Sequence, residues 1–140
     1  MAVNVEAKRE WLRRGISVNR ELQMLKETRE RVFNDATHIT THYGAGRGSG
    51  SVEVHRFDKL AEVDSFIKEK ERELVELRSE LLQAIYTVPF LEGREVLICR
   101  YIHALNPLDI AEKLSYSDRH IKRVHAKALE AIQIPMQKGA

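Results

Sequence analysis

The chain of 140 residues has few cysteines, prolines and glycines and no long apolar segment. Its single cysteine, Cys99, cannot form a disulfide within the chain and indicates a reducing compartment. Three prolines and seven glycines are too few for a turn-rich all-β protein. No apolar run approaches the roughly 20 residues of a membrane span, and residues 1–10 lack the apolar part of a secretory signal. We therefore expect a cytoplasmic protein without a membrane partner.

Aromatic residues and net charge are low as well. Aromatic residues make up 6% of the chain and charged residues 31%, a combination typical of extended helices rather than of a large globular core. The composition predicts an all-α fold. Because 23 lysines and arginines stand against 21 acidic residues, the formal net charge is only +2 and does not by itself indicate a nucleic-acid-binding protein.

The strongest periodic pattern lies in residues 57–88. Apolar residues alternate three and four positions apart there, and only Lys70 breaks the series, which is typical of a coiled-coil helix. Asp58 is expected to cap the start of this helix, and Pro89 is expected to end it.

A less regular version of the pattern runs from about Val5 to Phe33, with interruptions at Gly15 and Arg29. Neither helix can bury its apolar stripe alone, so the two are expected to pair with each other or with a second chain. Residues 1–88 are therefore predicted to form a coiled-coil and oligomerisation region, with a homodimer or a higher homo-oligomer as the expected assembly.

The segment between these stretches, residues 34–56, is predicted to be a flexible loop, because four of the seven glycines lie between positions 44 and 50. A phosphate-binding P-loop requires a lysine after its last glycine, and no lysine follows any of these. A dinucleotide-binding motif would need a third glycine at the position of Ser49.

Metal and catalytic sites find little support. His38 and His42 are four residues apart, as metal ligands on a helix would be, but no second pair accompanies them, and His55 and Cys99 could join only through tertiary contacts. Cys99 follows three aliphatic residues and is expected to be buried. The sequence thus predicts no metal, no cofactor and no enzymatic activity.

From residue 91 onward the pattern predicts short helices. A helix is expected over 94–104; Asn106 and Pro107 suit the cap and first turn of a second helix, and Ser117 suits the cap of a third. The dipeptide 115–116 would make the turn between the last two. Two short helices joined by a tight turn are the signature of a helix-turn-helix module, here predicted over residues 89–136.

The third of these helices, predicted over 117–132, is basic. Between positions 117 and 127 four lysines and arginines stand against Asp118 alone, and His120 and His125 could add charge as the pH falls. An apolar stripe on the same helix would bury one face and present the basic face to the major groove of DNA. The predicted DNA-binding residues are Ser117, Arg119, His120, Lys122, Arg123 and Lys127.

Residues 91–97, Tyr101, 110–114 and 126–129 resemble region 4 of bacterial sigma factors, which reads an upstream promoter element. The resemblance covers about residues 90–133; Ser115 stands where glycine is common, Asp118 where arginine is common, and no region 2 is present. The layout of long helix, glycine-rich loop, heptad helix and C-terminal module is similar to the ArpU/RinA-type late transcription regulators of phages and prophages.

This resemblance implies a sequence-specific DNA-binding transcription regulator acting on double-stranded DNA in a bacterial host. Arg119, Lys122 and Arg123 would contact bases or nearby phosphates, and Ser117 and Lys127 the backbone. Two alternatives remain open: a phage terminase small subunit that recognises a packaging site, and a coiled-coil adaptor that binds host RNA polymerase. The target sequence and the sign of regulation do not follow from the sequence.

Overall fold

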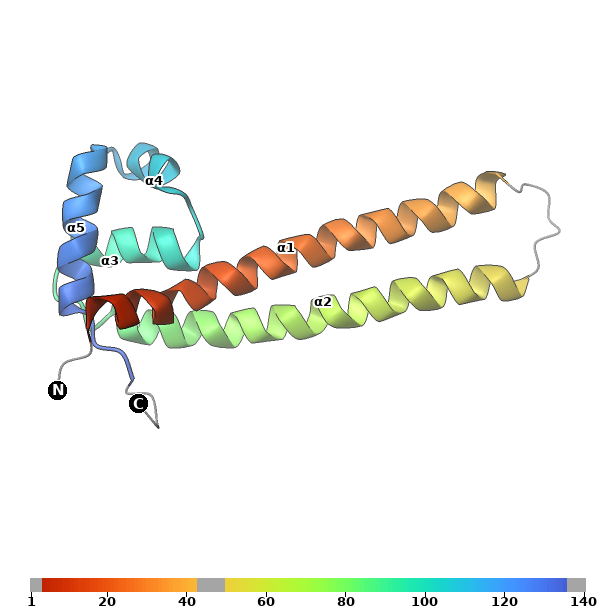
Figure 1. Ribbon diagram of the computed structural model, residues 1–140, viewed down its shortest axis with the longest axis horizontal. Helices are drawn as coiled ribbons and strands as arrows, with labels where there is room; N and C mark the ends of the chain where they lie inside the picture. Colours follow the sequence, from red (N-terminus) through yellow and green to blue (C-terminus); the bar gives the residue numbers. More distant parts are fainter. Residues whose placement is uncertain (1–3, 43–49, 136–140) are drawn as a thin grey trace. The chain divides into compact units, whose positions relative to one another are not determined.

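The computed structural model describes residues 4–42 and 50–135, and for 38–42 and 50–56 it describes the backbone alone. The elements in chain order are α1 (Val5–His42), α2 (Gly50–Ile85), α3 (Leu91–Leu97), the π-helical turn η1 (Ile98–Ile102), α4 (Pro107–Leu114) and α5 (Asp118–Ala131) (Figure 1). The expected all-α fold is confirmed. Within the described residues, none of the helices combines the length and the apolar character that crossing a membrane requires.

The two long helices extend further than the sequence pattern predicted. α1 continues to His42 and α2 already begins at Gly50, so the predicted loop is helical at both ends, and Asp58 lies inside a helix instead of capping one. In α1 the buried side chain of Ala36 and a hydrogen bond from the Thr37 hydroxyl to the Phe33 carbonyl accommodate these residues in helical form. The central part of the predicted loop, residues 43–49, lies outside the described residues.

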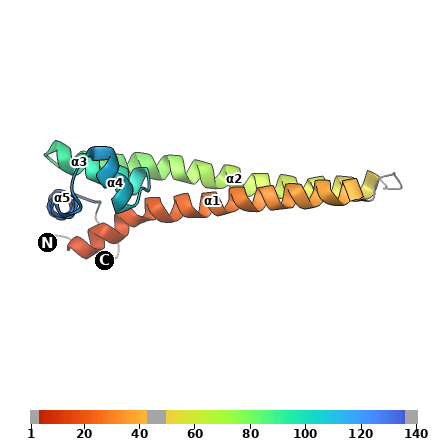
Figure 2. The same ribbon diagram turned by 90° about the horizontal axis from the view of Figure 1, so that it is seen from above.

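The chain divides into two compact units: unit 1 comprises Met1–Asn19 with Leu74–Ala140, and unit 2 comprises Arg20–Glu73. Unit 2 is an antiparallel pair formed by α1 and α2 (Figures 1 and 2). Its buried side chains come from both helices and lie on the predicted stripes; they are Leu22, Ala36, Leu60 and Ile67. The apolar stripes therefore pair within a single chain.

Both interruptions of the stripes in unit 2 have partners on the opposite helix. Arg29 donates from Nε to Oδ1 of Asp64 at 2.5 Å. Lys70 binds the carboxylate of Glu21 and, at 2.8 Å, that of Glu73 on its own helix. Hydrogen bonding to Glu21 and Glu73 raises the pKa of Lys70 above its ordinary value. The positions that break the heptad pattern are thus ion pairs, which favour one register of the two helices.

Unit 1 has a core that crosses the boundary expected at residue 88. Trp11 and Leu12 of α1 and Leu81 of α2 share one buried cluster with Ala128 and Leu129 of α5. The segment from α3 to α5 packs directly on the ends of the long helices, because their apolar stripes continue to residue 88 and find no other cover within the unit. The other buried members of this cluster are Leu77, Ala84, Ile85, Val88, Leu97, Tyr101 and Ile132.

Gly15, which interrupts the apolar pattern of α1, marks a close approach of elements in unit 1. A Cβ atom at this position would lie 2.4 Å from the backbone oxygen of Tyr101 and 2.7 Å from Cδ1 of Leu81. Such distances are too short for any side chain, so glycine allows α1 to pack against η1 and α2 here.

Candidate nucleic-acid interface

The first helix of the module, α4, begins as the sequence predicted. The Oδ1 atom of Asn106 accepts a hydrogen bond from the backbone N–H of Asp109 at 2.9 Å, and Pro107 occupies the first helical position. Asp109 places a negative charge in the first turn, where the helix dipole favours it. This capping fixes where α4 starts and hence which of its side chains face the core.

The turn between α4 and α5 is also formed by the predicted residues. Ser115 has φ 58° and ψ 40°, a left-handed conformation, and its N–H bonds to the carbonyl of Ala111. Glycine is favoured in this conformation, which explains why it is common at the equivalent position of related motifs. Ser117 then caps α5, since its Oγ accepts from the N–H of His120 at 3.1 Å.

The inner face of the module is held by a second small core. The buried residues are Val96, Cys99, Ile110, Ile121 and Val124, with Leu105, Ala111, Leu114 and Tyr116 packed around them. Burial raises the pKa of the Cys99 thiol, so this cysteine is a packing residue rather than a reactive thiolate. Because this core and the larger cluster both contain α5 residues, one face of α5 is fixed along its length.

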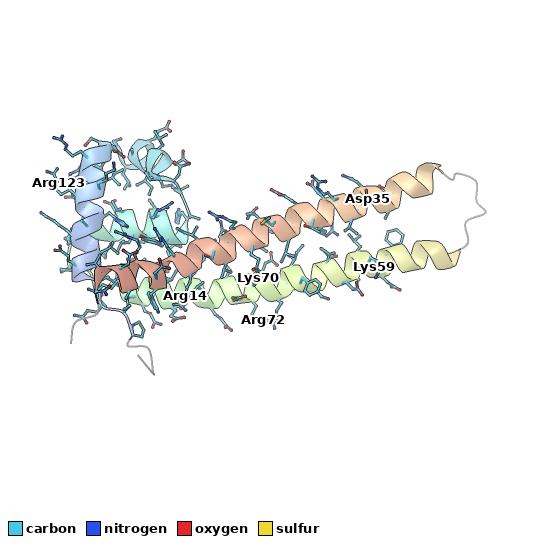
Figure 3. All side chains as sticks on the ribbon, viewed as in Figure 1. Arg14, Asp35, Lys59, Lys70, Arg72 and Arg123 are labelled. Atoms are coloured by element: carbon cyan, nitrogen blue, oxygen red, sulfur yellow. The ribbon has the colours of Figure 1, made fainter. Side chains whose placement is uncertain are left out.

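The opposite face of α5 is exposed and basic. Arg119, Lys122, Arg123 and Lys127 are all exposed, and Arg123 projects outward from the helix (Figure 3). Lys122 pairs with Asp118 one turn earlier at 3.1 Å, an exposed contact that contributes little to stability. Arg119 and Lys127 have no ion-pair partner in the part of the chain that the structure describes. Their charges are therefore available to an anionic ligand.

His120 connects this face to α3. Its Nε2 lies 3.0 Å from Oε2 of Glu92, and its Nδ1 lies 3.0 Å from Nη2 of Arg123. A guanidinium can only donate, so Nδ1 accepts, and Nε2 carries the proton that it donates to Glu92. The ring also meets Tyr116 edge-on, with centroids 4.7 Å apart. His120 therefore orients Arg123 rather than presenting a free ring.

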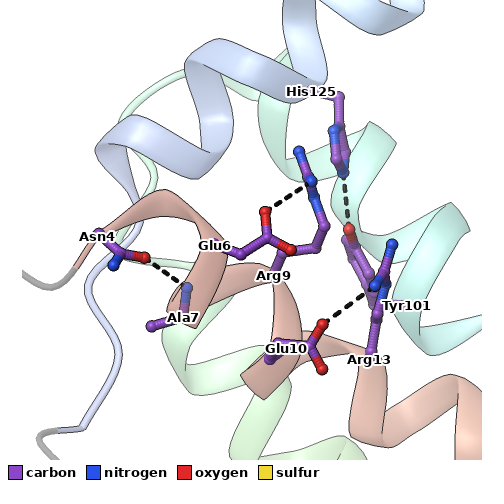
Figure 4. A network of polar contacts seen from close by, with 8 residues as sticks. All are labelled: Asn4, Glu6, Ala7, Arg9, Glu10, Arg13, Tyr101 and His125. Atoms are coloured by element: carbon purple, nitrogen blue, oxygen red, sulfur yellow. Dashed lines mark hydrogen bonds and ion pairs between the residues drawn. The ribbon is translucent and has the colours of Figure 1, made fainter.

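His125, which was expected to add charge to the basic helix as the pH falls, is turned inward. Its Nε2 shares a hydrogen bond of 2.8 Å with the Tyr101 hydroxyl, and the two rings stack with centroids 5.7 Å apart (Figure 4). Burial, and then the charges of Arg9, Arg100 and Arg13, lower the pKa of His125 to about 4. The expectation was wrong because His125 follows Ile121 by four residues and so lies at the edge of the buried stripe.

A shallow pocket opens beside the basic face. It has a volume of about 310 Å³ and is lined by Phe90, Glu92, His120, Arg123, Val124 and Lys127. Glu92 is the one acidic side chain of this lining, and sequence reasoning did not include it among the site residues. No local pattern could have identified it, because it is 28 residues away from His120 in the chain.

The structure brings the six predicted DNA-binding residues together on α5 and its cap. In the described parts of the chain, no three histidine, cysteine, aspartate or glutamate side chains are grouped as metal ligands. The side chains of His38, His42 and His55, which the sequence raised as candidates, lie outside the described residues.

No family model, no curated protein and no solved structure matches this chain.

Proposed function

We propose that this protein is a sequence-specific DNA-binding transcription regulator that inserts α5 into the major groove. The observation that carries the proposal is the basic face of α5, which is the second helix of a capped helix-turn-helix and is fixed by buried residues on its other side. A major groove is wide enough to admit one α-helix, and its base edges present a distinct donor and acceptor pattern for each base pair.

Individual roles follow from exposure and partners. Arg119 and Arg123 are the base-reading residues of this proposal, because a guanidinium can donate two hydrogen bonds to O6 and N7 of guanine. His120 restrains Arg123 from one side, which reduces the conformational entropy lost when Arg123 binds. Lys122 and Lys127 would contact phosphates, and the Ser117 hydroxyl, which accepts at the helix cap, can still donate its hydrogen to one.

The proposal extends to a phage or prophage origin, supported by the resemblance of residues 90–133 to sigma region 4 and by the layout of the chain. It assigns a binding role rather than a catalytic one. The apolar stripes of the long helices are buried within one chain, so a homodimer or a higher oligomer would need a different surface or an exchange of helices between chains. A single module of this kind buries about 600–1,000 Å² on DNA, and a second copy on an adjacent half-site would double this area.

The experiment is a salt titration of binding to a fluorescently labelled random-sequence duplex, measured by anisotropy. The double variant Arg119→Gln with Arg123→Gln is expected to bind at least tenfold more weakly than the wild type. The matched control is Lys68→Gln with Arg72→Gln, which removes two exposed charges from α2 in unit 2. Equal affinities of the wild type and the α5 variant would contradict the proposal. An equal loss of affinity in both double variants would mean that binding depends on the net charge of the protein and not on the basic face of α5.

A further inference from the structure

The first turns of α1 are fixed against α5 within unit 1. Nζ of Lys8 donates to the backbone carbonyl of Glu130 near the end of α5, at 3.0 Å. Trp11 and Leu12, one turn further along α1, are buried in the same cluster as Leu129. The N-terminal turns of α1 therefore have a fixed position beside α5, and a ligand bound by α5 would lie close to them.

Three guanidinium groups surround the Tyr101–His125 pair in this region. Arg9 lies beside His125 and Arg13 lies beside Tyr101 (Figure 4). Arg100 from η1 is close enough to act on both rings, and it also donates from Nη1 to the carbonyl of Leu105 at 2.9 Å. Burial, and then these three charges, lower the pKa of His125. The contribution of the arginines indicates a positive electrostatic potential around the ring.

This positive region is continuous with the basic face of α5. A small pocket of about 110 Å³ next to α5 is lined by Arg100, Lys122 and His125, together with Val96, Pro107, Ile110 and Ile121. Lys122 belongs to the exposed face of α5, where its only ion-pair partner among the described residues is the exposed Asp118. His125 is adjacent to Arg9 and Arg13 of α1. Cations from α5, η1 and α1 thus follow one another along a single side of the recognition helix.

The carboxylates in this region are weak competitors for an incoming anion. Arg9 pairs with Glu6 at 3.0 Å and Arg13 with Glu10 at 3.1 Å, both within one turn of the same helix. Glu6 and Glu10 keep about two thirds of their side-chain surface exposed, 63% and 64%. Exposed pairs of this spacing contribute little to stability, whereas an arginine can bind a phosphate through two parallel hydrogen bonds. Figure 4 shows both carboxylates on the side of the arginines away from the Tyr101–His125 pair.

We propose that Arg9 and Arg13 of α1 form, with Arg100 and Lys122, a binding site for the phosphodiester backbone of the DNA that α5 reads. The inference depends on the proposed function and adds a second contact region to it. When α5 lies in the major groove, the strand on the α1 side of the groove passes this cationic row. Contacts of this kind position the protein and add affinity without distinguishing sequences.

The test is the salt dependence of binding to a random-sequence duplex by the full chain, with Arg9→Gln and Arg13→Gln combined. Loss of two phosphate contacts is expected to weaken binding about tenfold at 150 mM salt and to flatten the slope of log affinity against log salt by about 2. The preference for any selected site over random DNA is expected to stay unchanged. Far-ultraviolet circular dichroism and the urea midpoint verify that this variant is folded.

Two further variants make the test specific. Arg20→Gln with Arg31→Gln removes two exposed arginines of the same helix that belong to unit 2, and it is expected to keep the wild-type slope. Glu6→Gln with Glu10→Gln releases the two arginines of the proposed site and is expected to bind random DNA severalfold more tightly.

A wild-type slope for the Arg9 and Arg13 variant would overturn this inference, and so would an equal flattening in the unit 2 control. The proposed function would survive either result, provided that the Arg119 and Arg123 variant still lost binding. Loss of binding in neither the α1 nor the α5 variant would overturn both proposals.

Discussion

Lowering the pH from 7 to 5 is expected to destabilise this protein through His125. The pKa of this side chain falls from 6.5 to about 4 in the folded chain, because the ring is buried and faces Arg9, Arg100 and Arg13. Between these two pH values the unfolded chain binds a proton at His125 that the folded chain does not bind. The stabilisation is therefore fully present above about pH 6.5 and is lost as the pH falls towards 4.

The size of the effect follows from the same two pKa values. A change from 6.5 to about 4 corresponds to about 3 kcal/mol in total, and about 2 kcal/mol of this is lost between pH 7 and pH 5. The protonated ring could still donate to the Tyr101 hydroxyl, so the cost comes from burying a cation beside other cations and not from breaking that hydrogen bond.

Urea unfolding at pH 7 and at pH 5 measures the prediction. For His125→Gln, which cannot be protonated, the free energy of unfolding should fall by about 2 kcal/mol less than that of the wild type over this range. The matched control is His103→Gln, an exposed histidine of the same unit, which should keep the wild-type fall. An NMR titration of the His125 ring gives the pKa directly. A pKa near 6.5, or an unchanged pH dependence of stability in His125→Gln, would show that burial does not oppose protonation of this ring.

Three other variants test the packing, the turn and the DNA contacts. Gly15→Ala should lower the free energy of unfolding by about 1–2 kcal/mol in urea, because a methyl group 2.4 Å from the Tyr101 carbonyl outweighs the gain of about 1 kcal/mol in helix propensity; equal or greater stability would contradict this packing. Ser115→Gly should raise the thermal midpoint, with a gain of up to about 1 kcal/mol from removing left-handed strain, and a lower midpoint would argue against the turn. Arg123→Ala should reduce the preference for a selected site about tenfold. Lys127→Ala should weaken binding to all DNA alike and flatten the slope of log affinity against log salt by about 1. Anisotropy measures both, and identical behaviour of the two variants would contradict the assigned roles.

The parts of the fold that the sequence predicted are those with local causes. The caps at Asn106 and Ser117 depend on side chains three residues from the N–H groups that they bind, so residue type and spacing indicate them. The stripe of α5 follows in the same way from its helical period, and with it the basic face that carries Arg119 and Lys127.

The parts that were missed depend on contacts between distant residues. In the sequence, Arg29 and Lys70 only interrupt the heptad pattern. In the structure they form ion pairs with Asp64 and Glu21 on the opposite helix. The limits of the long helices were misplaced for a related reason. The polar residues at both ends of the predicted loop disfavour a helix only weakly, and pairing with a neighbouring helix overrides this preference.

The site itself was only partly accessible from the sequence. Its cationic residues on α5 lie in one short run of sequence. The residues that contact this run come from distant parts of the chain. Glu92 reaches His120 from α3, and Arg9 approaches α5 from the other end of the chain. Only packing of the two chain ends into one unit brings these charges together.

Sequence-specific reading by α5 is tested by selection of duplexes from a library of genomic fragments with the purified protein, at about 150 mM salt with excess competitor DNA. We expect one or a few sites to be enriched, with a shared motif that spans a major-groove half-site. The enrichment should disappear with Arg119→Gln and Arg123→Gln. Enrichment next to a packaging gene would instead favour a terminase-like role. Recovery of all fragments in proportion to their abundance would contradict sequence-specific reading by α5.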